Sequence, residues 1–355
     1  MSKSLLVTGA AGFIGANFVH YWARAHPTDT LVAYDALTYA GNIANLASLQ
    51  GQSNFSFVHA DICDYATVLA ILREHKVDTI VHFAAESHVD RSITGPDAFI
   101  ETNIVGTYTL LKAAREVWLG GAAALPHRFH HVSTDEVYGS LAATAPAFSE
   151  QHKYEPNSPY SASKAASDHL VRAYHHTYGL QVSTSNCSNN YGPFHFPEKL
   201  IPLCITNILR GLPLPVYGDG SNIRDWLYVE DHCRGIELVL QRGAVGETYN
   251  IGGNNEWSNL AIVERLCDAL DARFASDPVL AARFPAAPGA AGSSARKLIS
   301  FVEDRAGHDW RYAIDAHRIT VELGYDPRES FETGLERTLD WFLANEDWWR
   351  PLLAG

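Results

Sequence analysis

The sequence predicts a doubly wound α/β protein, with helices on both faces of a parallel sheet and a smaller α/β domain attached. Three observations predict it. Short apolar runs alternate with stretches of helical periodicity through residues 4–186, and this alternation is typical of a parallel sheet. A glycine-rich turn separates the first apolar run from the first helical stretch, and an acidic residue ends the second run.

Six short segments are predicted to be the strands of the sheet. They are residues 4–8, 31–35, 55–59, 79–83, 128–133 and 181–186. Apolar positions three and four residues apart predict the helices between them. These helices are residues 13–22, 65–75, 97–118 and 160–178.

After residue 192 the segments become shorter and richer in Pro and Gly, so we place a first domain at 1–192 and a second mainly at 193–355. Residues 246–252 are predicted to form a strand that returns to the first sheet, and 233–255 therefore belong with the first domain. The Ala, Gly and Pro-rich residues 285–295 predict a mobile loop. Residues 331–349 predict one amphipathic helix, whose tryptophans we assign to packing.

Composition limits the functional classes. The chain has 355 residues, 46% hydrophobic and 19% charged, which is typical of a globular protein. A net charge of −13 disfavours nucleic acid as a partner. No signal peptide is recognisable and no apolar stretch approaches the roughly 20 residues that span a bilayer. The five cysteines are scattered without a CxxC pair, so we expect no metal site, no disulfide framework and a cytoplasmic protein.

The glycine-rich turn predicts a phosphate-binding site. Gly9, Gly12 and Gly15 stand between the first strand and the first helix, where a helix N-terminus offers N–H groups to a pyrophosphate. Asp35 ends the second strand twenty residues after Gly15. A carboxylate there accepts hydrogen bonds from ribose hydroxyls and repels a 2′-phosphate, so this Rossmann sheet is predicted to bind NAD rather than NADP.

We expect the cofactor to contact the turn and the residues that follow the carboxyl ends of the strands. For Asp61 a helix N-cap is an equally good interpretation. The predicted cofactor-binding residues are Gly9, Gly12, Phe13, Ile14, Gly15, Asp35, Asp61, Ile62, Ala84, Ala85, Ser87, Tyr160, Lys164 and Asn189.

A second motif predicts the chemistry. Tyr160 and Lys164 form a YxxxK pair at the start of a predicted helix, and residues four apart share one helix face. The Lys164 ammonium is expected to lower the pKa of Tyr160, so that the phenolate removes a proton from a substrate hydroxyl. Thr134 ends the fifth strand and could hydrogen-bond the same hydroxyl.

These motifs carry a family resemblance. TGAAGFIG, YSASK and CSNNYGP together resemble the extended short-chain dehydrogenase/reductases that act on nucleotide sugars, along nearly the whole chain. Longer segments are similar to the dTDP-glucose 4,6-dehydratases within that family. They are FAAESHVDRSI (83–93), FIETNIVGTYTLL (99–111), TDEVYG (134–139), EKLIP (198–202), LPVYGDGSNIRDWLYVEDH (214–232) and FVEDRAGHDWRYAID (301–315).

Two adjacent carboxylates fit a reaction that eliminates water, which needs one acid and one base. Asp135 and Glu136 follow Thr134, and paired carboxyl groups in one site tend to titrate apart, which yields one acid and one base. The resemblance implies that Tyr160 deprotonates the hydroxyl at carbon 4 while hydride passes to NAD. It further implies that Glu136 removes the proton at carbon 5 and that Asp135 protonates the hydroxyl leaving carbon 6. NADH would then return hydride to carbon 6, and carbon 5 would be reprotonated. The product would be a 4-keto-6-deoxy sugar, with NAD retained.

The resemblance also implies a substrate site. Its predicted residues are Ser87, Asn190, Glu198, Lys199, Leu200, Pro215, Tyr217, Arg224, Asn259, Arg305 and His308. One departure is Trp310, which stands where the pattern has a basic residue. In the resembled family the helices equivalent to 99–118 and 165–178 pair across a homodimer, although burial within one chain would explain their aromatics equally well.

Three other functions stay open at this stage. A nucleotide-sugar 4-epimerase would share Tyr160 and Lys164 but would need no Asp135–Glu136 pair. A dehydratase for another nucleotide sugar, such as UDP-glucose, would differ at the pocket for the base. A non-catalytic NAD(H) sensor would need none of the five predicted catalytic residues.

Overall fold

A computed structural model describes residues 2–304 and 307–353 of the chain. Its central sheet has seven parallel strands in the order β10-β6-β5-β4-β1-β2-β3. The strands are β1 (Ser4–Thr8), β2 (Thr30–Asp35), β3 (Phe55–His59), β4 (Thr79–His82), β5 (Arg128–Thr134), β6 (Val182–Cys187) and β10 (Thr248–Ile251). The doubly wound Rossmann sheet is thereby confirmed, and the predicted strand at 246–252 does return to it as β10.

The strand order reverses between β1 and β4. In sheets of this kind the crevice outside the carboxyl ends of the strands, at such a reversal, is where ligands bind. Thr8 at the end of β1 pairs with His82 at the end of β4, so the chain leaves both strands at the same edge. We therefore expect the binding site at that edge of the sheet.

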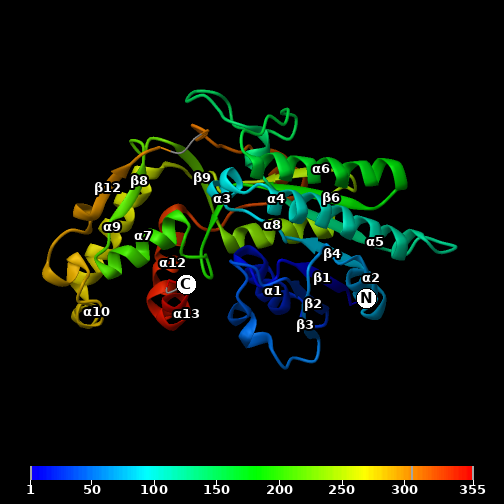
Figure 1. Cartoon of the computed structure of the whole chain (residues 1–355), viewed down its shortest axis with the longest axis horizontal. Helices are drawn as coiled ribbons and strands as arrows, with labels where there is room; N and C mark the ends of the chain where they lie inside the picture. Colours follow the sequence, from blue (N-terminus) through cyan, green and yellow to red (C-terminus); the bar gives the residue numbers. More distant parts are fainter. Residues whose placement is uncertain (1, 305–306, 354–355) are drawn as a thin grey trace.

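Helices cover both faces of the sheet (Figure 1). One face carries α1 (Phe13–Ala25), α8 (Val229–Arg242) and α11 (His317–Leu323). The other carries α2 (Tyr65–Glu74), α5 (Thr107–Leu119) and α6 (Pro159–Tyr178). Successive strand residues enter opposite cores, since side chains alternate along a strand: Leu5 and Val7 pack with α1, and Leu6 packs with α5.

The predicted helix at 97–118 is not regular. The structure has α3 (Val89–Thr94), α4 (Asp97–Phe99) and a π-helix (Ile100–Gly106) before α5. In the π-helix, the Asn103 side chain accepts a hydrogen bond from the Glu86 amide at 2.9 Å and donates one to the Glu86 carbonyl at 3.0 Å. Wide turns of this kind are frequent at functional sites, and this one holds the segment that follows β4.

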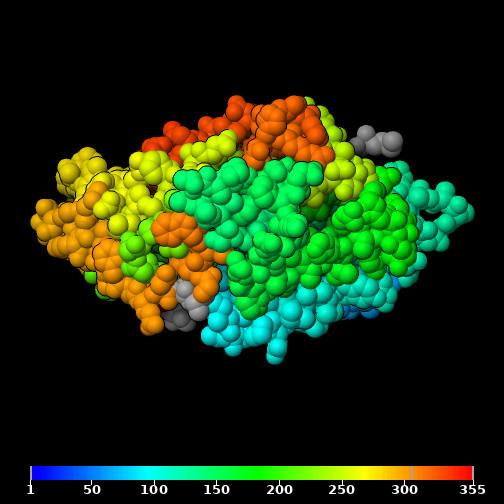
Figure 2. Space-filling model, turned by 90° about the horizontal axis from the view of Figure 1, so that it is seen from above, coloured from blue at the N-terminus to red at the C-terminus, as the bar shows by residue number. Residues whose placement is uncertain are grey.

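The C-terminal part has two small sheets. One contains β7 (Asn189–Tyr191), β9 (Ile223–Tyr228) and β11 (Glu256–Ser258), and the other pairs β8 (Leu214–Tyr217) with β12 (Ile299–Val302). Its helices are α7 (Leu200–Arg210), α9 (Asn259–Ser276), α10 (Pro278–Arg283), α12 (Phe331–Ala344) and α13 (Glu346–Leu352). They enclose a core of their own, and seen from above, α9 and α10 form one end of an elongated molecule (Figure 2).

The two cores do not follow a single break at residue 192. The strand β7 precedes that residue but belongs to a C-terminal sheet, and its Tyr191 lies in the C-terminal core. The helix α11 comes late in the chain, yet Ile319 and Leu323 pack against α8 and β10 of the first core.

Residues 285–295 are mainly loop with a short 3-10 helix (Pro288–Ala291), and they are packed in place, because Ala287 and Ala295 are buried and the Ala295 amide donates to the Asp271 carboxylate at 3.0 Å. Two predictions for the C-terminal part are wrong. The single helix predicted at 331–349 is two helices, because Asn345 has non-helical φ and ψ of −119° and 46°. The expectation of short segments also fails at α9, which runs for 18 residues.

Candidate active site

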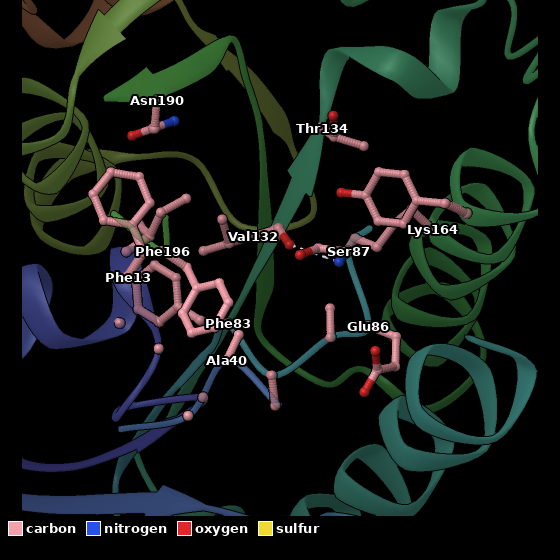
Figure 3. A pocket seen from close by; sticks show the side chains of 18 of the residues that line it. Phe13, Ala40, Phe83, Glu86, Ser87, Val132, Thr134, Lys164, Asn190 and Phe196 are labelled. Atoms are coloured by element: carbon pink, nitrogen blue, oxygen red, sulfur yellow. Dashed lines mark hydrogen bonds between the residues drawn. The ribbon is translucent and has the colours of Figure 1, made fainter. Parts of the chain in front are cut away.

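A cavity of about 380 Å³ lies at the carboxyl ends of the central strands. The segments that follow β1, β2, β4, β5 and β6 form one side of it, and residues 195–200 form part of the other. In the close view, Thr134 and Lys164 lie on one side of the cavity, and the rings of Phe13, Phe83 and Phe196 lie across from them (Figure 3).

The glycine turn is packed so tightly that side chains have no room. Gly9 has φ of +66°, and a Cβ there would lie 2.6 Å from the Ala84 nitrogen. A Cβ on Gly15 would lie 2.0 Å from the Gly9 carbonyl oxygen. The turn therefore brings backbone N–H groups, rather than side chains, to the cavity at the start of α1, which is the arrangement that binds phosphate.

Asp35 is held at the end of β2 by backbone donors. Its Oδ2 accepts from the Ala11 amide at 2.9 Å and its Oδ1 from the Leu37 amide at 2.8 Å. Burial raises the pKa of this carboxyl, and the hydrogen bonds from Leu37 and Ala11 oppose the rise. The carboxylate thus links the glycine turn to the loop after β2 and lines the cavity where a ribose would have to lie.

The predicted YxxxK pair enters the same cavity from the first turns of α6. Lys164 is buried, and its Nζ donates to the Val132 carbonyl at 2.8 Å. The pKa of Tyr160 lies well above its usual value, first because of burial and then because of the Glu136 and Cys187 charges, while a hydrogen bond with Thr134 lowers it. The sequence-based expectation that Lys164 lowers this pKa is not met in the protein alone.

Asp135 is the most deeply buried carboxyl of the predicted pair, with 1% of its surface exposed. Its Oδ1 accepts from the Thr134 hydroxyl at 3.4 Å, and its Oδ2 has no hydrogen-bond partner among the residues that the structure describes. Burial, followed by the charges of Glu136 and Asp225, raises the pKa of Asp135 well above its ordinary value. A carboxyl with a raised pKa keeps its proton to higher pH than an ordinary Asp, and in a cavity wall it is suited to donate that proton.

The opposite side of the cavity carries charges that are only partly buried. Glu198 accepts from Arg91 at 3.2 Å, and the Arg91 guanidinium lies 3.9 Å from the ring centroid of Tyr39. The second carboxylate oxygen of Glu198, Oε1, is buried without a hydrogen-bond partner among the described residues. The Lys199 ammonium donates to the Ser87 carbonyl at 3.3 Å. These contacts join the loops after β2 and β4 to the segment before α7.

The structure brings most of the predicted site residues together. All predicted catalytic and cofactor-binding residues line the cavity, as do five of the predicted substrate residues. Those five are Ser87, Asn190, Glu198, Lys199 and Leu200. Pro215, Tyr217, Arg224, Asn259 and His308 are not part of its lining, and Arg305 lies outside the described residues.

Three of the substrate candidates beyond the cavity, Tyr217, His308 and Arg224, have contacts that bear on such a role. The rings of Tyr217 and His308 lie edge to face, with centroids 6.3 Å apart. Arg224 is buried, donates to the Ile223 and Asp309 carbonyls at 2.7 and 3.0 Å, and is close enough to Asp135 to lower its pKa. Trp310, where the resemblance has a basic residue, exposes 41% of its surface.

Sequence reasoning missed several residues that line the cavity. The missed polar and aromatic ones include Tyr39, Glu86, Cys187, His195 and Phe196. Tyr39 and Cys187 follow strand ends, so the rule about carboxyl ends could have found them. His195 stacks on Phe13 with ring centroids 4.2 Å apart, and nothing in the sequence relates those two positions.

Within residues 2–304 and 307–353, no group of three or more His, Cys, Asp or Glu side chains is placed to hold a metal ion. None of the helices in that part of the chain combines the length and apolarity needed to cross a membrane.

Comparison with known proteins relates the chain to sugar-nucleotide dehydratases. Residues 6–338 match the family model described as GDP-mannose 4,6 dehydratase. The dTDP-glucose 4,6-dehydratase of Xanthomonas campestris pv. campestris is 54% identical over 356 residues, which cover 99% of this chain and 96% of the relative. The enzyme of the same name from Salmonella typhimurium is 52% identical, with the same coverage of both chains.

Solved structures agree with that relationship. The dTDP-glucose 4,6-dehydratase of Streptomyces venezuelae, solved with NAD bound, has a TM-score of 0.87 and 48% identity, and covers 99% of this chain and 100% of its own. The UDP-glucuronic acid 4-epimerase of Bacillus cereus, in complex with UDP-glucuronic acid and NAD, has a TM-score of 0.81 and 26% identity, and covers 96% and 99%.

Proposed function

The chain belongs to the dTDP-glucose 4,6-dehydratase family, and we propose that it converts dTDP-glucose to dTDP-4-keto-6-deoxyglucose and water with bound NAD. The observation that carries the proposal is the meeting of Asp135, Glu136 and Tyr160 in one cavity next to the glycine turn. Simple oxidation needs Tyr160 alone, whereas removal of water needs an acid and a base in addition.

The residues present fit NAD. The turn at Gly9 and Gly15 is a cradle that any Cβ would fill, and Asp35 is fixed with its carboxylate in the cavity wall. When bound, NAD would supply the hydride exchange of the reaction and a positively charged nicotinamide ring. The pKa of Tyr160 is raised in the protein alone, and a positively charged ring beside it would favour the phenolate.

The protein's own groups then have separate tasks. Tyr160 takes the proton of the hydroxyl at carbon 4, and Thr134, which hydrogen-bonds Tyr160, holds that hydroxyl in place. Lys164 lies one helical turn from Tyr160 in α6, and its Nζ is held by the bond to the Val132 carbonyl. Glu136 removes the proton at carbon 5, and carbon 5 is reprotonated after hydride reaches carbon 6. Asp135, whose pKa is raised by burial, supplies the proton for the hydroxyl that leaves carbon 6.

We assign NAD to residues 1–192 together with 233–255, and the nucleotide sugar mainly to 193–355. Ser87, Asn190, Glu198, Lys199 and Leu200 line the cavity and would contact the hexose and diphosphate. Pro215, Tyr217, Arg224, Asn259 and His308, and Arg305, which the structure does not describe, remain our candidates for the diphosphate and base. The preference for dTDP over UDP belongs to this part of the proposal.

We also propose a homodimer that works in the cytoplasm in deoxysugar biosynthesis. Exposed apolar side chains occur on the helices within 99–118 and 165–178, which the resemblance implies to pair. They are Ile100, Val105, Tyr108 and Tyr178. The cysteines are free thiols, which a reducing compartment would preserve. Sedimentation of the purified protein at micromolar concentration tests the dimer, and a monomer would refute it.

The deciding experiment is to incubate the purified protein with dTDP-glucose without added NAD. The product is followed by mass spectrometry and by the alkaline absorbance of a keto sugar. Loss of one water with formation of a 4-keto product supports the dehydratase and a retained cofactor. No reaction with dTDP-glucose but turnover of UDP-glucose would change the substrate, and interconversion without loss of water would indicate a 4-epimerase. Binding of NAD without turnover of either sugar would indicate a sensor.

A further inference from the structure

The tryptophan-rich C-terminal helices also contact the N-terminal part of the chain. Figure 1 shows α12 and α13, in red, beside the blue N-terminal segment that contains α1. The Trp348 indole Nε1 donates to the Asn45 side-chain oxygen at 2.7 Å, across 303 positions of sequence. Asn45 is 2% exposed and lies in a 3-10 helix (Ile43–Leu49) between β2 and β3.

Asn45 is in turn hydrogen-bonded to the glycine turn. Its side-chain Nδ2 donates to the Ala11 carbonyl at 2.8 Å, and the Asn42 amide donates to the same carbonyl at 3.0 Å. The Ala11 amide in turn donates to Asp35 at 2.9 Å. Ala11 lies between Gly9 and Gly12, so its peptide groups set the direction of the turn. A chain of hydrogen bonds, partly buried at Trp348 and buried beyond it, thus runs from α13 to the turn and to Asp35.

A second contact of the same helices stabilises strained backbone beside the turn. Phe194 has φ of +63°, a left-handed conformation that is unfavourable for a bulky residue. Its ring packs edge-on against Trp341, with centroids 5.0 Å apart, and against Trp348 at 6.0 Å. The next residue, His195, stacks on Phe13 at the start of α1. The C-terminal aromatics therefore support both sides of the first turn of α1.

We propose that Trp348 is a positioning residue for NAD, which acts through Asn45 on the glycine turn; the inference rests on the NAD site proposed above. Trp348 itself does not line the cavity, and neither does Asn45. Removing the indole N–H frees the Asn45 amide to rotate, and the Ala11 carbonyl then loses one of its two donors. The turn becomes less well ordered, so bound NAD dissociates faster.

The neighbouring tryptophan is a matched control. Trp349 is fully buried, and its Nε1 donates to the Phe342 carbonyl at 2.9 Å, a contact within the C-terminal helices. Trp348→Phe and Trp349→Phe each remove one indole N–H from α13 and keep an aromatic ring. If the C-terminus served packing alone, both changes would lower thermal stability and neither would alter the release of NAD.

The experiment measures the NAD content of each purified protein and the rate at which bound NAD exchanges with labelled NAD. We expect Trp348→Phe to release NAD about 3- to 10-fold faster than wild type, the effect of losing one buried hydrogen bond. Trp349→Phe should release NAD at the wild-type rate. Asn45→Ala should reproduce the faster release. The double variant Asn45→Ala, Trp348→Phe should release NAD no faster than either single variant, because both changes break the same chain of hydrogen bonds.

Unchanged NAD exchange in Trp348→Phe, with wild-type protein retaining NAD, would overturn the inference while leaving the proposed function intact. Equal acceleration by Trp348→Phe and Trp349→Phe would overturn it too, because the effect would then be a general loss of stability. A wild-type protein that neither contains nor binds NAD would instead contradict the proposed function.

Discussion

The two sides of the cavity differ in how deeply their charged side chains are buried. On the side formed by the central sheet, Asp135 and Lys164 are buried, with 1% and 4% of their surfaces exposed. On the side formed by residues 195–200, the Glu198 side chain is 18% exposed, and its partner Arg91, which lies outside the cavity lining, is 50% exposed. On the sheet side burial therefore controls the pKa of Asp135 and Tyr160, whereas on the other side solvent screens the charges.

This difference has a functional meaning. Burial raises the pKa of Asp135 and lowers that of Lys164, so the sheet side determines which groups carry protons. Screened ion pairs contribute little free energy, but they can break and re-form as ligands enter and leave. We therefore expect substitutions on the sheet side to act on kcat, and substitutions on the loop side to act mainly on KM.

The largest effect is expected from Tyr160→Phe. It removes the base of the first proton transfer, so kcat should fall about 10³-fold or more. The ring and the packing remain, so the NAD content of the purified protein should stay at the wild-type level. A loss of NAD in this variant would mean that Tyr160 mainly binds the cofactor, and the contrast between the two sides would weaken.

A somewhat smaller loss is expected from Glu136→Gln. The amide cannot remove the proton at carbon 5, so elimination should slow by roughly 10²- to 10³-fold while oxidation at carbon 4 continues. Mixing the variant with dTDP-glucose should build up NADH absorbance at 340 nm without loss of water. Normal turnover would show that Glu136 is not the base at carbon 5.

The raised pKa of Asp135 predicts how kcat depends on pH. A carboxyl is protonated below its pKa, and this pKa is raised, so activity that needs the acid should persist above the ordinary range of Asp and fall as pH rises through the raised value. Asp135→Asn should lower kcat by about 10²-fold and remove that alkaline decline, since an amide does not ionise. The pH profiles of kcat for both proteins check this, and an identical decline in the variant would assign it to another group.

The smallest effect is expected on the loop side. Arg91→Met breaks the pair with Glu198 and the contact with Tyr39, and should raise KM for the nucleotide sugar about threefold with kcat within a factor of two, because the pair is half exposed. Arg91→Lys, which keeps the charge, should recover part of the affinity. A fall in kcat comparable to that of Asp135→Asn would erase the distinction between the two sides.

The sheet side is also the side that sequence reasoning predicted best. Strands 4–8 and 55–59 were predicted with the bounds of the structure, and the other central strands within two residues. The runs at 4–8, 31–35 and 79–83 are easily recognised because parallel strands buried on both faces are apolar nearly throughout. Once the strands are known, their carboxyl ends must meet at one edge. For this reason Gly9, Asp35, Thr134 and Tyr160, far apart in sequence, were all placed in one site.

The C-terminal part was predicted less well, because its elements carry few local sequence signals and are defined by the segments they pack against. The break at Asn345 that separates α12 from α13 has no Pro or Gly to mark it. Residues 285–295 lack any periodicity, yet they pack on α9. The predicted substrate residues that fall outside the cavity lining also lie here, where a likeness of sequence identifies positions without placing them.

The amino-acid order by itself determined the Rossmann sheet, the glycine turn and the pairs Tyr160–Lys164 and Asp135–Glu136, because each depends on periodicity or on residues close together along the chain. The tertiary structure alone decided that the pKa values of Asp135 and Tyr160 are raised, because the largest cause is burial by elements distant in sequence. It also decided that Trp348 meets Asn45. Contacts of this kind depend on how two cores pack together, and no local pattern encodes that packing.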